Sequence, residues 1–153
     1  MRIVLQRVNR ASVHVDGSAT GEIETGLLAF VGVAEGDDES DARAAALKIV
    51  GMRIFPDRDG KMNVSLAGAG GSVLLVSQFT LLAEVRKGRR PAFTAAADPE
   101  AARPVLAALA DAIEAHGIPV EHGRFGAHML VDLVNDGPVT IVFDVAGGRV
   151  VSR

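Results

Sequence analysis

The sequence predicts an α+β fold in which mostly antiparallel strands carry two helices on one face. Three observations lead to this prediction: alternating apolar and polar residues at the N-terminus, two helical patterns set between strand patterns, and Gly- or Pro-containing turns that separate them. The order of strands, helix, strands, helix, strands differs from the regular alternation of a doubly wound fold. The 153 residues are expected to form one domain, residues 1–153.

The N-terminal third is predicted to contain four strands. Residues 2–8 and 11–15 alternate apolar and polar side chains, as half-buried strands do. The turn signal Asp16-Gly17 follows, so residues 19–23 can return as a hairpin partner. The continuous apolar run 27–33 is typical of a strand that is buried on both faces.

The first helix is predicted after this apolar run. Four small or apolar residues at i, i+3, i+4 and i+7 define its buried face: Ala42, Ala45, Ala46 and Ile49. Asp37, Asp38 and Ser40 are candidate N-caps, because each can accept a hydrogen bond from the first free N–H groups. Residues 53–55 then predict a short strand, which is followed by a Pro- and Gly-containing turn at 56–60.

The middle of the chain predicts a strand, a surface loop and the second helix. Residues 72–79 form an apolar strand pattern, and residues 83–97 form a charged loop. Asp98-Pro99 is a typical helix start. Pro104 removes a backbone hydrogen bond early in this helix, so either the helix kinks there or it begins near Pro104. Gly117 is a natural stop.

The C-terminal part predicts strands again. Residues 129–134 and 139–145 are expected to be two strands, with a turn at 135–138 between them. A return through Gly147-Gly148 to residues 149–152 is expected to add a last strand.

The composition excludes several classes of protein. There is no Cys, so disulfides, thiolate nucleophiles and Cys-based zinc sites are absent. The net charge of −3 argues against a protein that coats nucleic acid through charge alone. No apolar run is long enough to span a bilayer, and no signal-like leader precedes the first strand, so a cytoplasmic location is expected.

Motifs for phosphate loops and metal sites are also missing. The sequence has no G-x-x-x-x-G-K-[ST] loop and no H-E-x-x-H. The four histidines, His14, His116, His122 and His128, show no metal-ligand spacing with a carboxylate. We therefore expect no metal site and no cofactor.

Two polar segments stand out as candidate functional sites. The first, Ser77-Gln78-Phe79-Thr80-Leu81, ends a buried strand, where polar side chains often meet a ligand. From chemistry alone these side chains can equally satisfy backbone groups in a turn. Neither hydroxyl has a base nearby in sequence, so a Ser-His-Asp triad is not indicated. The second segment, Asn135-Asp136-Gly137-Pro138-Val139-Thr140, reads by itself as an ordinary turn.

Taken together, the two segments resemble the two signature motifs of the D-aminoacyl-tRNA deacylase family. The resemblance extends in order along essentially the whole chain. It also includes residues 1–15, Arg53-Ile54-Phe55-Pro56 with Gly60-Lys61-Met62-Asn63, Lys87-Gly88-Arg89-Arg90-Pro91, and Gly123-Arg124-Phe125-Gly126-Ala127 with Met129.

The resemblance implies a barrel-like β-sandwich of mostly antiparallel strands with two covering helices, assembled as a homodimer. It implies that a cis Gly137-Pro138 peptide reaches into the partner's pocket. Backbone carbonyls there would meet the α-amino group of a D-amino acid and exclude an L side chain by steric clash, which is specificity through rejection. Glycine has no side chain, so glycyl-tRNA would also be cleaved.

The Ser77–Thr80 segment resembles the other wall of the family's pocket. The resemblance makes Phe79 and Met129 candidates to contact the terminal adenine, and Ser77 and Gln78 candidates to orient the ester. Thr80 is either a nucleophile or part of a pocket in which the tRNA's own 2′-hydroxyl helps to activate water. Because no base lies near Thr80, we favour the second interpretation, in which positioning and backbone oxyanion donors carry catalysis.

Three alternatives stay open at this stage. Family relatives with a trans Gly-Pro step remove L-threonine from mischarged tRNA instead. A dimeric RNA-binding module could use the basic cluster Arg86, Lys87, Arg89 and Arg90 without turnover. A hydrolase could also act on a small ester through Thr80 and ignore the tRNA end.

Overall fold

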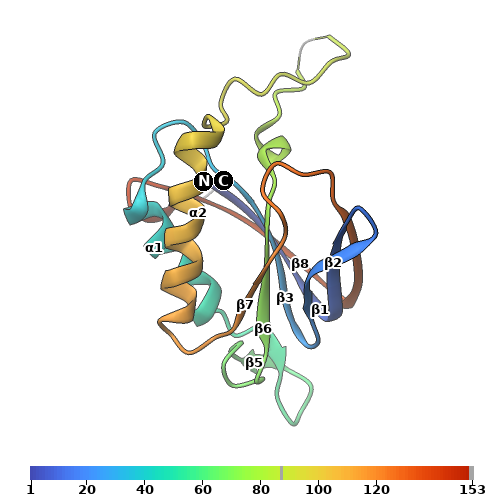
Figure 1. Ribbon diagram of the computed structural model, residues 1–153. Coiled ribbons are helices and arrows are strands. Elements are labelled where there is room, and N and C mark those ends of the chain that lie inside the picture. The colour runs from blue at the N-terminus through green and yellow to red at the C-terminus, as the bar shows by residue number, and fades with distance from the viewer. Residues whose placement is uncertain (87, 152–153) are drawn as a thin grey trace.

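The structure is a computed structural model that describes residues 1–86 and 88–151, and it places two helices beside a large curved sheet (Figure 1). The strands are β1 (Arg2–Val15), β2 (Ser18–Ile23), β3 (Gly26–Gly32), β4 (Phe55–Pro56), β5 (Met62–Val64), β6 (Ser72–Ser77), β7 (Val120–His122), β8 (Leu130–Ala146) and β9 (Arg149–Val151). The helices are α1 (Glu39–Gly51), the 3-10 turn η1 (Phe79–Leu82) and α2 (Pro99–Glu114).

The predicted α+β class with two helices is confirmed. The main sheet has the order β7-β6-β3-β1-β8-β9, and β2 pairs with β1 beside this path. β3–β6 and β6–β7 are parallel, whereas the other paired strands in the described ranges are antiparallel. The described strands form an open sheet with β7 and β9 at its ends, so the closed barrel that the resemblance implied is not formed.

The long strand β1 supplies residues to two hydrophobic cores. Its first half places Ile3 and Leu5 in the core beneath α1 and α2, and its second half places Val8 and Val13 in a smaller core under β2. The pairing of β1 with β8 is irregular between these halves, near residues 6–10. Such bulges turn the strand, so one strand can present side chains to two cores.

Both helices begin where the sequence predicts. Asp38 caps α1 by accepting hydrogen bonds from the N–H groups of Ser40 and Asp41, and the Asp41 carboxylate accepts one from the Asp38 N–H. The bonds from Ser40 and Asp41 hold the pKa of Asp38 below its usual value. The second helix begins at Pro99 and contains Pro104, so the alternative start near Pro104 is wrong. Gly117, at φ +76°, follows the end of α2.

Other boundaries differ from the prediction. Residues 2–8 and 11–15 belong to one strand, and the segments predicted at 129–134 and 139–145 also belong to one strand, which begins at Leu130. The predicted turn at 135–138 is wrong because these residues lie within β8, which pairs with β1 on both sides of a register shift, Gln6 with Thr140 and Val8 with Asn135. The strand predicted over 72–79 ends at Ser77, and the one predicted at 53–55 begins at Phe55. β5 and β7 were not predicted.

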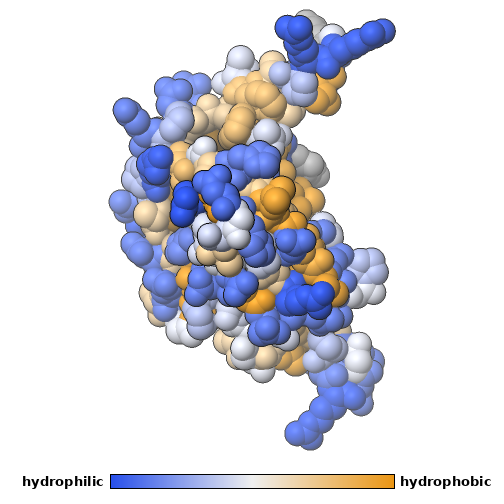
Figure 2. All heavy atoms as spheres, turned by 45° about the vertical axis from the view of Figure 1, so that its right-hand side comes forward, coloured by the Kyte–Doolittle hydropathy of each residue, from blue (hydrophilic) through white to orange (hydrophobic). Residues whose placement is uncertain are grey.

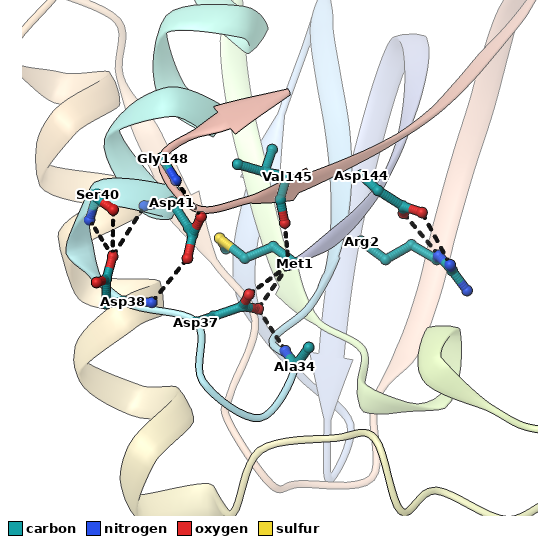
Figure 3. A network of polar contacts seen from close by, with 10 residues as sticks. All are labelled: Met1, Arg2, Ala34, Asp37, Asp38, Ser40, Asp41, Asp144, Val145 and Gly148. Atoms are coloured by element: carbon teal, nitrogen blue, oxygen red, sulfur yellow. Dashed lines mark hydrogen bonds and ion pairs between the residues drawn. The ribbon is translucent and has the colours of Figure 1, made fainter. Parts of the chain in front are cut away.

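The amino terminus is anchored inside this framework (Figure 3). The Met1 ammonium group, which is fully buried, donates to Asp37 Oδ1 at 2.8 Å and to the Val145 carbonyl at 2.7 Å. The other Asp37 oxygen accepts from the Ala34 N–H at 2.6 Å. This candidate cap therefore pairs with the amino terminus and leaves the capping of α1 to Asp38.

We expect Asp37→Asn to lower the free energy of unfolding by about 3 kcal/mol, because it leaves a buried charge without its counterion. Chemical denaturation followed by circular dichroism would measure the loss. Glu39→Gln is the control, since it removes only the exposed pair with Arg43 and should cost less than about 0.5 kcal/mol. Equal losses in the two variants would contradict a structural role for the buried pair.

Candidate functional site

A cavity of about 560 Å³ lies at the end of β6, where the first polar segment begins. Its walls come from the β6 end, the loop before α2, the first turn of α2, and the segment before β8. The lining residues are Val33, Val76, Ser77, Gln78, Phe79, Phe93, Ala96, Ala97, Asp98, Pro99, Ala102, Phe125, Gly126, Ala127, His128, Met129 and Val131. We call this cavity the main pocket. Its volume falls within the range of about 300–1,000 Å³ that is usual for small-molecule sites.

Four of the predicted site residues meet in the main pocket: Ser77, Gln78, Phe79 and Met129. The main chain fixes Gln78, because its N–H donates to the Val31 carbonyl at 2.8 Å and its carbonyl accepts from the Leu81 N–H at 3.2 Å. The turn η1 follows directly. Backbone positions at such a strand end are therefore set by the sheet and not by a flexible loop.

Thr80 is not a lining residue of the main pocket. Its hydroxyl accepts a hydrogen bond from the Gln78 side-chain amide, which ties the two polar side chains together at the pocket rim. Within the described residues, no histidine or carboxylate bonds to Thr80. The structure therefore gives Thr80 no base that could activate it as a nucleophile.

The apolar wall of the main pocket can receive a flat ring. Phe79 is 54% exposed, and it meets Phe93 edge to face with ring centroids 5.1 Å apart. Met129 lies against Gly123, where a Cβ atom would come within 2.8 Å of the Met129 sulfur. A larger residue at position 123 would therefore displace Met129 from the pocket.

Sequence reasoning missed much of the rest of this wall. Residues 83–97 read as a charged surface loop, yet the end of that loop returns to the body of the protein. There the Glu35 N–H donates to the Ala95 carbonyl and the Ala97 N–H donates to the Val33 carbonyl, both at 3.0 Å. Phe93, the one aromatic residue in the sequence of that loop, was the available signal.

The second polar segment forms a wide bulge in β8. Arg7 alone on β1 faces residues 136–139, because its neighbours Gln6 and Val8 already pair with Thr140 and Asn135. The side-chain amide of Asn135 closes the bulge by donating to the carbonyls of Arg7 and Val139, at 2.9 and 3.0 Å. The Gly137-Pro138 peptide within it is cis.

Arg7, which sequence reasoning did not assign to the site, supports this bulge from beneath. Its side chain is 9% exposed and donates through Nη1 to the Ile54 carbonyl. Arg7 Nε lies 2.9 Å from Asp136 Oδ2, where the charges attract although the N–H is not directed for a hydrogen bond. Arg7 Nη2 would be 3.1 Å from a Cβ at Gly137, so the guanidinium packs directly against the glycine.

The structure does not bring the two polar segments into one pocket. Neither Gly137 nor Pro138 is among the residues that line the main pocket within a single described chain. The bulge lies on β8, which β3 and β1 separate from β6 in the sheet. Within a single copy, the main pocket and the Gly137-Pro138 bulge are therefore separate.

The predicted basic cluster is partly neutralised. Arg86 pairs with Glu84 at 2.8 Å, and these hydrogen bonds lower the pKa of the Glu84 carboxyl. Lys87 lies outside the described residues. Arg89 and Arg90 are exposed on the loop that extends from the body of the protein between residues 84 and 92 (Figure 1). Within residues 1–86 and 88–151, no group of three or more His, Cys, Asp or Glu residues could hold a metal ion, and no helix is long and apolar enough to cross a membrane.

Comparisons with known proteins identify the family of the chain. The family model for D-Tyr-tRNA(Tyr) deacylase matches residues 4–144, a range that contains both polar segments. The chain belongs to this family. A D-aminoacyl-tRNA deacylase of Thermomicrobium roseum is 57% identical over 146 residues, which cover 95% of each chain. The enzyme described here is accordingly a D-aminoacyl-tRNA deacylase, a hydrolase.

Two solved structures show how well the fold matches. The c-Myc DNA Unwinding Element Binding Protein has a TM-score of 0.88 at 35% identity, covering 94% of the deacylase described here and 98% of that chain. A "probable eukaryotic D-amino acid tRNA deacylase" has a TM-score of 0.78 at 18% identity, covering 93% and 97%. At that lower identity the second match supports the fold alone.

Proposed function

We propose that this deacylase hydrolyses D-aminoacyl-tRNA and mischarged glycyl-tRNA in the cytoplasm, at a site that two copies of the chain build together. The observation that carries this proposal is the separation of the main pocket from the Gly137-Pro138 bulge within one copy. In a two-fold dimer the same bulge of a second copy can complete the pocket.

The main pocket suits the 3′ end of an aminoacylated tRNA. Phe79 and Met129 offer an apolar slot for the adenine, and Ser77 and Gln78 lie where the ester would follow. Carbonyls of the partner's Gly137-Pro138 step would then accept hydrogen bonds from the substrate ammonium group. Contacts to backbone discriminate by chirality and not by side-chain identity, so many D-residues and glycine would be accepted.

The surface of β8 is compatible with a homodimer. Leu130 and Val142 on this strand are 63% and 45% exposed, and Phe79 at the pocket rim is 54% exposed. Figure 2 shows apolar patches among hydrophilic side chains on the face that is turned forward. Exposed apolar patches are a common feature of interfaces between subunits.

A complementation experiment tests the shared site. Ala127→Trp would fill the main pocket, and Gly137→Ala would displace the bulge, so each homodimer should be inactive. Coexpressed with different affinity tags, the two variants should form heterodimers with one native site in two, and a 1:1 mixture should recover about a quarter of the wild-type sites. No recovery in purified heterodimers would show that each copy completes its own site.

The test of the activity itself compares D-tyrosyl-tRNA with L-tyrosyl-tRNA. We expect rapid loss of the D ester while the L ester persists. Equal cleavage of both would favour the relatives that act on L-threonyl-tRNA, and salt-sensitive binding without cleavage would favour an RNA-binding module. Inhibition by free adenosine would indicate an enzyme that binds the terminal adenosine of tRNA, and its absence would favour a hydrolase of small esters.

Thr80→Ala is expected to lower kcat/KM for D-tyrosyl-tRNA by no more than about tenfold, the worth of one hydrogen bond. The reason is that, among the described residues, the Thr80 hydroxyl has only the Gln78 amide as a hydrogen-bond partner and no base to activate it. Single-turnover deacylation measures the effect. A loss on the order of 10⁴-fold in a folded variant would instead indicate that Thr80 is the nucleophile.

Prolonged dialysis against EDTA is expected to leave the deacylation rate unchanged, because the described residues offer no cluster of metal ligands. The rate would be measured before dialysis, after dialysis, and after Zn²⁺ or Mg²⁺ is added back. A fall that either ion restores would contradict catalysis by positioning and backbone donors alone.

A further inference from the structure

A second, smaller cavity of about 250 Å³ adjoins the main pocket. The two cavities share Ser77 and Phe125 as walls. β6, α2 and the β7 end supply the remaining lining, which contains no carboxylate: Leu75, Arg103, Leu106, Ala107, His122 and Gly123. We call it the side pocket. Apart from Ser77, its lining lies outside the two polar segments.

Arg103, from the second turn of α2, is the only fixed cation in this lining. Its guanidinium carbon lies 4.2 Å from the centre of the Phe125 ring, so the group is stacked on the aromatic face. Within the described part of the chain, no carboxylate lies within ion-pair distance of Arg103. A stacked guanidinium keeps its N–H donors in the plane of the group and available to a ligand, in a geometry that is already fixed.

We propose that the side pocket binds the phosphodiester on the 5′ side of the terminal adenosine, with Arg103 as the main phosphate ligand and His122 as a neighbouring donor. This proposal rests on the function proposed above. The side pocket shares Ser77 and Phe125 with the main pocket, so it lies beside an adenosine that the main pocket would hold. An arginine fork matches phosphate oxygens in a bidentate manner.

The chemistry of the side pocket favours a phosphate over a base. Besides the His122 imidazole, Phe125 is the only aromatic ring among the described lining residues, and Arg103 already covers one face of it. Stacking of a second nucleobase therefore lacks a free platform on that face. In a chain with a net charge of −3, a phosphate needs a local cation, and Arg103 supplies one beside the site of cleavage.

The test compares two substrates, D-tyrosyl-tRNA and the 3′-ester D-tyrosyl-adenosine, which has no phosphodiester. For Arg103→Gln we expect kcat/KM with the tRNA to fall about tenfold, as for loss of one charged hydrogen-bonding group. The slope of log kcat/KM against log salt should shrink by about 0.7, the value for one phosphate of a single strand. Cleavage of D-tyrosyl-adenosine by the variant should stay within about twofold of wild type, because that substrate has no group for Arg103 to bind.

Arg43→Gln on α1 is the matched control for loss of one positive charge, since Arg43 is exposed and its ion pair is with the exposed Glu39. Arg103→Lys should recover part of the tRNA rate, because it keeps the charge and loses the fork. An equal loss on both substrates, or an unchanged salt slope, would overturn the phosphate role. If the wild type cleaves neither substrate, the proposed function fails, which is a separate outcome.

Discussion

Gly137→Ala is expected to lower kcat/KM for D-tyrosyl-tRNA by on the order of 100-fold or more, the effect of displacing a positioning group by about 1 Å. Gly137 has φ +126°, a backbone conformation that an L side chain rarely adopts. A Cβ there would lie 2.7 Å from Val139 Cγ2 and 2.9 Å from the Val139 nitrogen. The bulge must therefore move, and the carbonyls proposed to meet the substrate ammonium group move with it.

Gly17→Ala is the matched control. Gly17 also has a positive φ, +80°, but a Cβ there meets nothing within 4 Å, and the residue lies in the β1–β2 turn. This variant should lose about 1 kcal/mol of unfolding free energy and keep its activity. Steady-state kinetics and thermal unfolding of both variants separate an effect on catalysis from an effect on stability. Normal kinetics in Gly137→Ala would show that the bulge does not position the substrate.

The helices could be predicted from sequence because their signals are local. A carboxylate cap followed by an apolar face at helical spacing predicts the start and the buried face of α1, and Asp98-Pro99 offers one of two possible starts for α2. The α2 start also shows how tertiary packing decides between alternatives. Burial of Ala102 favours the longer helix, although Pro104 removes one of its hydrogen bonds.

The course of β8 could not be predicted because its signal is not local. Asn135 to Pro138 has turn chemistry, and nothing in the segment itself shows that β1 continues alongside it. The strand pairing forces these residues to bulge out of the sheet instead of reversing the chain. β7 could not be predicted for a similar reason. Its three residues form a strand because β6 lies beside them, and that pairing is also long-range.

Only the part of the candidate site that has a local sequence signal could be predicted. Ser77, Gln78 and Phe79 follow a buried strand, so their position was apparent, whereas Phe93 and Phe125 reach the main pocket only through the fold. Arg7 did carry a signal. Alternation in β1 places it on the buried face with Ile3 and Leu5, where an arginine is rare unless it has a partner.

Arg7→Met should lower the free energy of unfolding by about 3 kcal/mol and lower D-tyrosyl-tRNA deacylation by on the order of 100-fold. The substitution leaves the Ile54 carbonyl without its donor and Asp136 without its counterion. Asp136 is 37% exposed and can be hydrated, so most of the stability loss should come from the buried Ile54 carbonyl and the lost packing. Denaturation and single-turnover kinetics measure the two losses independently.

Asp136→Asn separates support of the bulge from support of the core. It removes the charge that meets Arg7 but leaves the hydrogen bond from Arg7 to the Ile54 carbonyl intact. We therefore expect a clear loss of deacylation activity with little loss of unfolding free energy. If Arg7 positions the bulge through Asp136, the double variant should be no less active than Arg7→Met alone. Additive losses in activity would show that Arg7 acts on the site by another route, and its direct packing against Gly137 would then be the contact to test.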